Sequence, residues 1–143
     1  MAGYFRKLNG YVYEGTYPSD APLQNGEFVE IVDGVVKKLS NPMDALFRVV
    51  EKTTLYGRKA LVLRVLKVPE QQDFFMVENE LPNHHGEDWD ETEYELPAGE
   101  LVRMKRPLLG EELIRTATDY EYGEAKLNGV AYPADNGDGL WFW

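Results

Sequence analysis

The chain has 143 residues, no cysteine and a net charge of −10, and 43% of its residues are hydrophobic. This length and composition predict one globular domain over residues 1–143 and exclude disulfides and thiolate metal ligands. The acidic charge argues against nucleic-acid binding, and no apolar run approaches the roughly 20 residues of a membrane span, so we expect neither a nucleic-acid nor a membrane partner.

The first 25 residues are predicted to form an N-terminal arm or hairpin followed by a loop. In residues 4–13, an Asn9-Gly10 pair stands between strand-like residues. Such a pair fits a two-residue hairpin turn, but it also fits an extended arm with a tight bend, because terminal segments are ordered only where something holds them. Residues 14–25 contain proline and glycine and are expected to be a loop. We expect no signal peptide, since the first residues lack an apolar core.

Residues 26–39 carry the clearest strand signal in the chain. Two runs rich in β-branched residues flank Asp33-Gly34. An Asp-Gly pair is typical of type I′ hairpin turns, in which both central residues have positive φ. A lone hairpin is unstable in water, so further strands must pair with it. The sequence therefore predicts an antiparallel β protein.

A second strand pair is predicted over residues 45–52 and 60–68, joined by a loop at 53–58 with Gly57 at its tip. The second run has apolar residues at both alternating positions. This pattern predicts a central strand, or a barrel strand whose outer face is partly covered. Residues 74–78 are expected to return antiparallel after a polar turn.

Residues 79–93 are acidic, contain no lysine or arginine, and lack any core-forming periodicity. We predict a solvated acidic loop, with an acidic contact surface for a basic partner as the alternative. His84 and His85 lie close to Glu87 and Asp88, and these residue types can bind zinc or a similar metal. Their spacing matches no metal-binding motif, so no metal site is predicted.

The remaining elements are predicted to be short. Strands are expected at residues 93–96, 100–105, 108–116 and 130–132, turns at 120–123 and 128–129, and a loop at 133–139. One helical turn is the alternative for 108–116. Residues 135–139 fail the register of a calcium-binding EF-hand loop. Short strands separated by turns predict an all-β fold, either a small antiparallel β-barrel or a sandwich, with an extended N-terminal segment and an acidic loop insertion.

Aromatic residues gather at both ends of the sequence, in residues 4–17 and 141–143. Packing within the protein is one interpretation, and anchoring to another protein, which favours tyrosine and tryptophan, is the other. Stacking on single-stranded nucleic acid would also need a positive groove, and only Arg6 and Lys7 are basic nearby. No nucleophile elbow, P-loop or dinucleotide fingerprint is present, so no enzyme and no cofactor are predicted.

Several segments resemble small structural proteins of tailed bacteriophages, of the head decoration or auxiliary capsid type. They are residues 4–13, 26–39, 47–57, 77–80, 99–104 and 107–111. The resemblance implies a non-enzymatic protein that sits on the outside of the assembled phage head, bridges neighbouring major capsid subunits and stabilises the shell. It implies the major capsid protein as partner, a homo-oligomer as a further possibility, and assembly in the host cytoplasm.

We expect the capsid contact in residues 4–13 and in the hairpin 26–39. The residues predicted to carry it are Tyr4, Phe5, Arg6, Tyr11, Tyr13, Phe28, Lys37 and Lys38. A head–tail connector or tail component is the alternative among structural proteins. A small-ligand-binding β-barrel, which needs an internal cavity, is the second alternative, and a metal-dependent hydrolase is the third.

Overall fold

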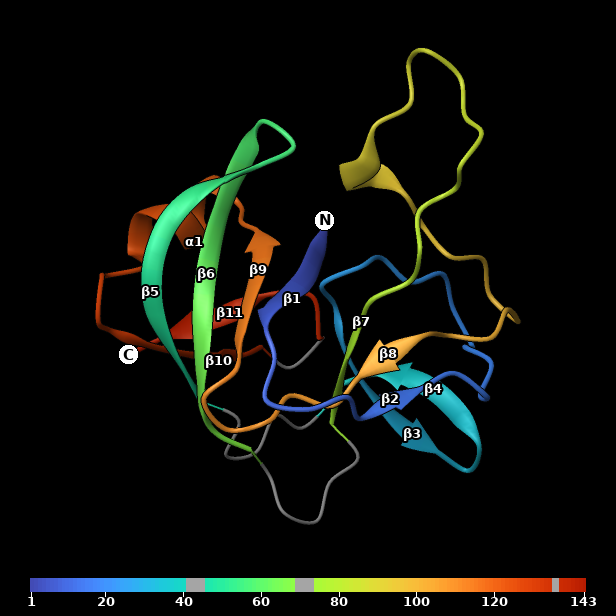
Figure 1. Cartoon of the computed structure of the whole chain (residues 1–143), viewed down its shortest axis with the longest axis horizontal. Helices are drawn as coiled ribbons and strands as arrows, with labels where there is room; N and C mark the ends of the chain where they lie inside the picture. Colours follow the sequence, from blue (N-terminus) through green and yellow to red (C-terminus); the bar gives the residue numbers. More distant parts are fainter. Residues whose placement is uncertain (41–45, 69–73, 135–136) are drawn as a thin grey trace.

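The computed structural model describes residues 1–40, 46–68, 74–134 and 137–143, and they form two antiparallel β-sheets (Figure 1). The six-stranded sheet has the order β1 (Gly3–Lys7), β9 (Glu112–Thr116), β6 (Arg58–Lys67), β5 (Leu46–Leu55), β10 (Val130–Pro133), β11 (Leu140–Phe142). The five-stranded sheet has the order β2 (Tyr13–Glu14), β8 (Met104–Lys105), β7 (Phe75–Val77), β3 (Phe28–Val32), β4 (Val35–Lys38). The prediction of an all-β fold is confirmed, and the two sheets fit the sandwich alternative.

The main hydrophobic core lies where the two sheets meet. Phe28 of the five-stranded sheet stacks on Phe47 of the other sheet and on Phe74, with ring centroids 5.4 Å apart in both pairs. Leu61 and Leu63 of the central strand β6 also belong to this core and have no solvent exposure. Burial of large aromatic and branched side chains from both sheets is what holds the sheets together.

The hairpin predicted at residues 26–39 is confirmed as β3 and β4. Asp33 and Gly34 have φ values of 50° and 77°, as a type I′ turn requires. The hairpin pairs with the rest of its sheet through β7, which contacts β3 at Phe28 and Val29.

The second strand pair is confirmed as β5 and β6, but the predicted loop at 53–58 is wrong. Both strands continue through it, and the turn consists only of Tyr56 and Gly57, with φ values of 51° and 75°. Residue 45, the predicted start of the first strand, lies outside the described residues. β7 does not pair with β6 as expected, because it crosses to the other sheet and lies between β3 and β8.

The N-terminal segment is extended and is not a hairpin. β1 pairs with β9 in one sheet, whereas β2 pairs with β8 in the other, so residues 8–12 connect the two sheets. Asn9-Gly10 therefore lies in a crossover and not in a two-residue turn.

Residues 79–93 form the expected loop, which ends in a short 3₁₀ helix, η1 (Glu91–Glu93). The strand predicted at 93–96 is wrong, since only Leu96 forms an isolated bridge, to Leu23. The turn predicted at 120–123 is instead a helix, α1 (Asp119–Glu124). Residues 135–136 of the predicted loop at 133–139 lie outside the described residues. Among the described residues, no helix is long and apolar enough to cross a membrane.

Candidate functional site

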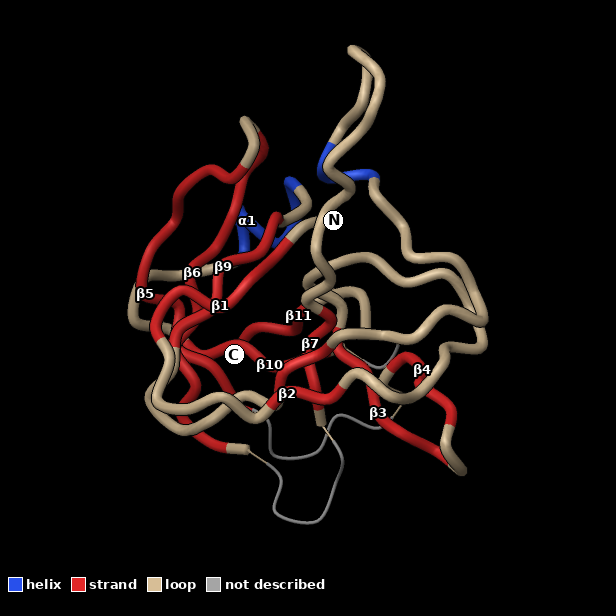
Figure 2. Tube along the Cα trace, turned by 45° about the vertical axis from the view of Figure 1, so that its right-hand side comes forward, coloured by secondary structure: helices blue, strands red, loops and turns tan. Residues whose placement is uncertain are grey.

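Two neighbouring connections between the sheets present an exposed apolar surface. Residues 8–12 join β1 to β2, residues 106–111 join β8 to β9, and the two loops run side by side in both views (Figures 1 and 2). Three of their side chains are largely exposed: Tyr11 at 78%, Val12 at 43% and Leu109 at 63%. We call Tyr11, Val12 and Leu109, with Tyr13 and Arg103 beside them, the loop-pair surface.

Backbone and side-chain hydrogen bonds fix the two loops to each other. The Arg106 N–H donates to the Val12 carbonyl at 2.9 Å. The Asn9 side-chain amide donates to the Leu109 carbonyl at 2.7 Å. Since these bonds join opposite ends of the two loops, the exposed side chains between them are held in a defined arrangement.

A buried ion pair lies directly beneath the loops. The Lys105 ammonium lies 2.5 Å from the Glu111 carboxylate, and both side chains have no solvent exposure. The same carboxylate accepts the backbone N–H of Leu108 at 2.7 Å and that of Asn9 at 2.8 Å, one from each loop. Glu111 therefore fastens both loops to one buried charge, and the pair acts as a clamp under the loop-pair surface.

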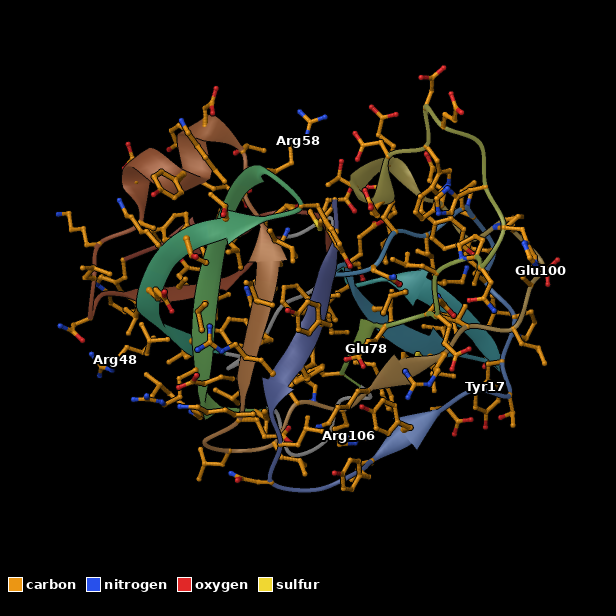
Figure 3. All side chains as sticks on the ribbon, turned by 45° about the horizontal axis from the view of Figure 1, so that its top comes forward. Tyr17, Arg48, Arg58, Glu78, Glu100 and Arg106 are labelled. Carbon is orange, nitrogen blue, oxygen red and sulfur yellow. The ribbon has the colours of Figure 1, made fainter. Side chains whose placement is uncertain are left out.

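A second set of polar contacts supports the tyrosine side of the surface. The Arg103 guanidinium lies 4.2 Å from the centre of the Tyr13 ring, and the Tyr11 and Tyr13 rings are stacked with centroids 6.4 Å apart. Glu78, at the junction of the sheets in Figure 3, accepts the Phe5 backbone N–H and the Tyr13 hydroxyl. Burial, together with the negative charge of Glu78, raises the pKa of Tyr13.

The predicted contact residues of the N-terminal segment lie in different places, and only some of them belong to the loop-pair surface. Tyr11 and Tyr13 belong to the loop-pair surface, and Tyr4 is 41% exposed on β1. Arg6, also on β1, lies 3.4 Å from Glu51 of the same sheet. Phe5 is only 7% exposed and packs in the main core, so its assignment to a contact surface is corrected.

The predicted contact residues of the hairpin do not join that surface. Phe28 has no solvent exposure, because its ring fills the core between the sheets, and its assignment is also corrected. Lys37 lies 3.4 Å from Asp20, and Lys38 lies 3.3 Å from both Glu27 and Asp138. The alternation of apolar and polar residues along β3 does not predict that Phe28 is buried, because β3 is covered on both faces near its start.

The histidines of the acidic loop make local contacts. The His85 ring stacks on Trp89 with centroids 4.3 Å apart, and its Nδ1 lies 3.2 Å from the Gly86 carbonyl. In the described part of the chain, no group of three or more histidine, aspartate and glutamate side chains is placed to hold a metal ion.

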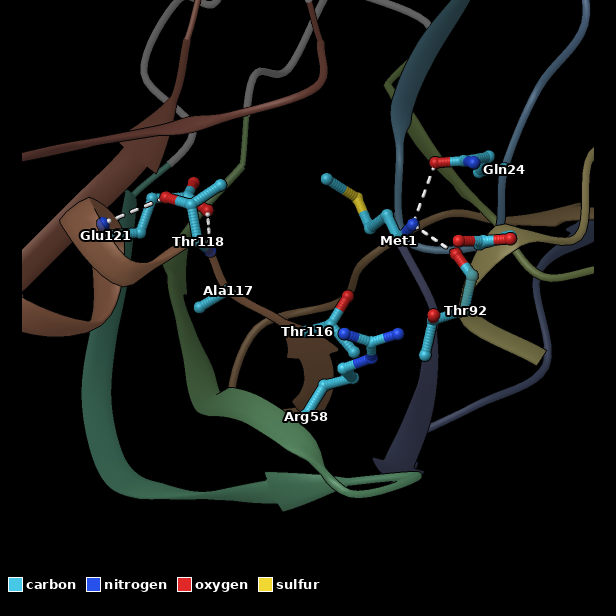
Figure 4. Close-up of a pocket in the computed structure, with 9 residues that line it drawn as sticks. Met1, Gln24, Arg58, Thr92, Thr116, Ala117, Thr118 and Glu121 are labelled. Carbon is cyan, nitrogen blue, oxygen red and sulfur yellow. Dashed lines mark hydrogen bonds between the residues drawn. The ribbon is translucent and has the colours of Figure 1, made fainter. Parts of the chain in front are cut away.

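A cleft of about 420 Å³ opens near the start of the chain (Figure 4). It is lined by residues from the start of the chain, the loop before β3, the start of β6, the acidic loop with η1, the end of β9 and α1: Met1, Gln24, Arg58, Thr92, Glu93, Thr116, Ala117, Thr118 and Glu121. Arg58 is paired with Asp90 at 2.9 Å. Hydrogen bonds from the hydroxyl and backbone N–H of Thr92, and the bond from Arg58, lower the pKa of Asp90 to about 2. The cleft offers threonine hydroxyl groups and the Gln24 amide, beside apolar surface, to a small molecule.

Sequence reasoning missed the residues that organise the loop-pair surface. Arg103 and Lys105 fall in the predicted strand 100–105 and Glu111 in the predicted strand 108–116, and none of the three was predicted to belong to a site. Charged side chains are almost never fully buried unless they are paired, so the sequence gives no signal for the burial of Lys105.

Comparison with known proteins gives no match. No protein-family model matches the chain, and searches of curated proteins and of solved structures find no match either.

Proposed function

We propose that this protein is a non-enzymatic structural protein of a phage head, and that it binds the outer surface of the assembled capsid through the loop-pair surface. The partner class comes from the sequence resemblance to head decoration proteins. The observation that carries the contact site is the exposed Tyr11 and Leu109 on two loops that a buried ion pair holds in place.

The composition of this surface supports a protein contact. Tyrosine and arginine are enriched among the residues that contribute most to protein–protein binding, and an apolar centre with a polar rim is the usual arrangement. Here Tyr11, Val12 and Leu109 supply the apolar centre, while Arg103 supplies a charged edge.

The rigidity of the two loops also supports the proposal. Ordering a flexible loop on binding costs free energy that subtracts from affinity. The Glu111 carboxylate holds one backbone N–H from each loop before any partner arrives. The loop-pair surface is therefore pre-organised for contact.

A capsid lattice suits a contact of modest size. A protein that binds the assembled shell and not its free subunits stabilises the shell by mass action. The net charge of −10 also lets copies of the protein, and free DNA, repel one another at the shell exterior.

Co-sedimentation with expanded capsids tests the proposal. The variant Tyr11→Ala/Leu109→Ala removes the apolar centre of the surface, and we expect it to lose binding and to lose the rise in capsid melting temperature. The matched control is Tyr120→Ala/Leu127→Ala, which removes the same residue types at similar exposures of 73% and 61% elsewhere on the molecule. Loss of binding in the control alone, or no binding by the parent protein at micromolar concentration, would reject the proposal.

The structural alternative, a head–tail connector or tail component, places the same surface against a different partner. Imaging of labelled protein on virions separates the two, since a decoration protein covers the head and a connector occupies one vertex.

A small-molecule-binding role is the second candidate, and the cleft of about 420 Å³ favours it because its volume lies within the range of ligand pockets. A thermal-shift screen with polar metabolites tests it. A stabilising hit that Thr118→Val abolishes would support the ligand-binding role against the capsid role.

A further inference from the structure

We propose a second site, unrelated to the loop-pair surface: the aromatic groove between α1 and β11 binds an alkylated ammonium group. The groove has a volume of about 220 Å³ and is lined by Tyr120, Glu124, Tyr132, Leu140, Trp141 and Phe142. The proposal goes beyond capsid binding and does not depend on it.

The walls of the groove come from the helix α1 and the paired strands β10 and β11. Tyr120 and Glu124 are four residues apart on α1, so they lie on the same face of the helix. Tyr132 of β10 and Trp141 of β11 are opposite each other in the ladder. Side chains that are paired in this way across two strands stand on the same face of the sheet.

A buried carboxylate fastens α1 to β11. Glu121 of α1 accepts the backbone N–H of Leu140 at 2.9 Å and that of Thr118 at 2.9 Å. The first bond joins the helix to β11, and the second closes the capping box of the helix. The groove is therefore a fixed feature and does not need a ligand to form it.

Several aromatic rings line the groove. The Tyr132 and Trp141 rings meet nearly edge to face, with centroids 5.5 Å apart and an interplanar angle of 82°. Two such rings and a third ring that lines the same cavity are the components of the cages that recognise quaternary ammonium groups. Tyr120, which is 73% exposed, supplies that third ring from the helix.

Charge complementarity favours a cation over a neutral apolar ligand. Glu124 lines the groove, and within the described part of the chain its carboxylate forms no ion pair. Elsewhere the protein covers aromatic faces with its own cations: Lys52 and Lys59 lie 5.1 and 5.4 Å from the centre of the Tyr122 ring. Among the described residues, no lysine or arginine side chain lies over the Tyr120, Tyr132 or Trp141 ring, so the groove has no cation of the protein's own.

NMR titration of the isotope-labelled protein with choline tests the site. We expect saturable shifts of the Trp141 indole signal, with a Kd on the order of 1 mM because cation–π contacts at a partly exposed site are individually weak. The uncharged isostere 3,3-dimethyl-1-butanol, which has the same shape, should bind about tenfold more weakly. Equal binding of the two compounds would overturn the proposal, since the groove would then be merely apolar.

Substitutions of the lining residues test whether choline binds in this groove. Tyr120→Ala should abolish the choline-induced shift of the Trp141 indole signal. Trp141→Leu should abolish the choline-induced shifts of the backbone amides of residues 140–142, and Tyr120→Ala at its exposed position keeps the test valid if Trp141→Leu unfolds. Glu124→Gln should weaken binding about threefold. Glu87→Gln changes the net charge equally in the acidic loop and should leave the Kd unchanged. Unchanged binding in Tyr120→Ala, or equal loss in both glutamine variants, would overturn the proposal.

Tetramethylammonium and arginine serve as further probes of the ligand class. Tetramethylammonium should compete with choline for the groove, because the site recognises the alkylated ammonium group and not the hydroxyl. Arginine should compete more weakly, since its planar guanidinium does not fill a three-walled cage. Competition by arginine at least as strong as that by tetramethylammonium would contradict the assignment.

Discussion

Replacing Glu111 by glutamine perturbs the clamp under the loop-pair surface at its centre. Glu111 and Lys105 are both fully buried, and removing one partner of such a pair costs about 3–5 kcal/mol, because the remaining charge is left uncompensated. Glutamine also has only one acceptor oxygen, so the backbone N–H of either Asn9 or Leu108 loses its partner, at a cost of about 1–3 kcal/mol. We expect the free energy of unfolding to fall by about 3 kcal/mol or more.

Urea denaturation measures this loss directly, and the double variant Lys105→Met/Glu111→Gln is its control. Because the double variant leaves no buried charge, it should be more stable than Glu111→Gln alone. A Glu111→Gln variant within about 0.5 kcal/mol of the parent would refute the clamp. So would a double variant that is less stable than the single one.

Three further predictions concern other parts of the fold. Burial and a hydrogen bond with Asp138 raise the pKa of Glu27 from 4.5 to about 7, so the stability that its proton contributes is complete below pH 4.5 and declines as the pH rises to 7. Urea unfolding across this range should show a decline that Glu27→Gln removes, and equal slopes would contradict it. Gly137→Ala should lower the melting temperature more than Gly57→Ala, because both have positive φ but only at Gly137 would a Cβ collide with backbone atoms; equal losses would show that packing at Gly137 is unimportant. Thr118→Ala removes the N-cap of α1 and should cost about 1 kcal/mol in urea unfolding, and an unchanged midpoint would argue against the capping box.

The parts of the fold that were predictable depend on local chemistry. A type I′ turn between two strands requires positive φ at both central positions, and the pair Asp33-Gly34 adopts that conformation readily. The apolar run over β6 likewise required cover on both sides. Such signals predict the pairing of strands that are consecutive in the chain, but they do not predict which sheet a later strand joins.

The misassigned elements were decided by distant contacts or by a signal that was overlooked. β7 leaves β6 and pairs with β3 and β8, and no residue of β7 encodes that choice. The helix α1 did have a local signal, since Thr118 and Glu121 have the spacing of a capping box, but the prediction of a turn did not take it into account.

The candidate site was predictable only in part for the same reason. Tyr11 and Tyr13 lie in the segment that was singled out, whereas their neighbours Arg103 and Leu109 come from the other end of the chain. Arg115 shows the limit most clearly. It is a charged residue with no solvent exposure, and burial lowers its pKa, although its sequence position in β9 looks ordinary.

Hydrogen–deuterium exchange of the protein bound to expanded capsids, compared with the free protein, tests the central claim most directly. We predict slower exchange of backbone amides in residues 8–12 and 106–111, with no change in the exposed residues 83–88 of the acidic loop. Protection of the acidic loop with none in the two connecting loops, or no protection anywhere in a co-sedimenting complex, would contradict the assignment of this surface to capsid binding.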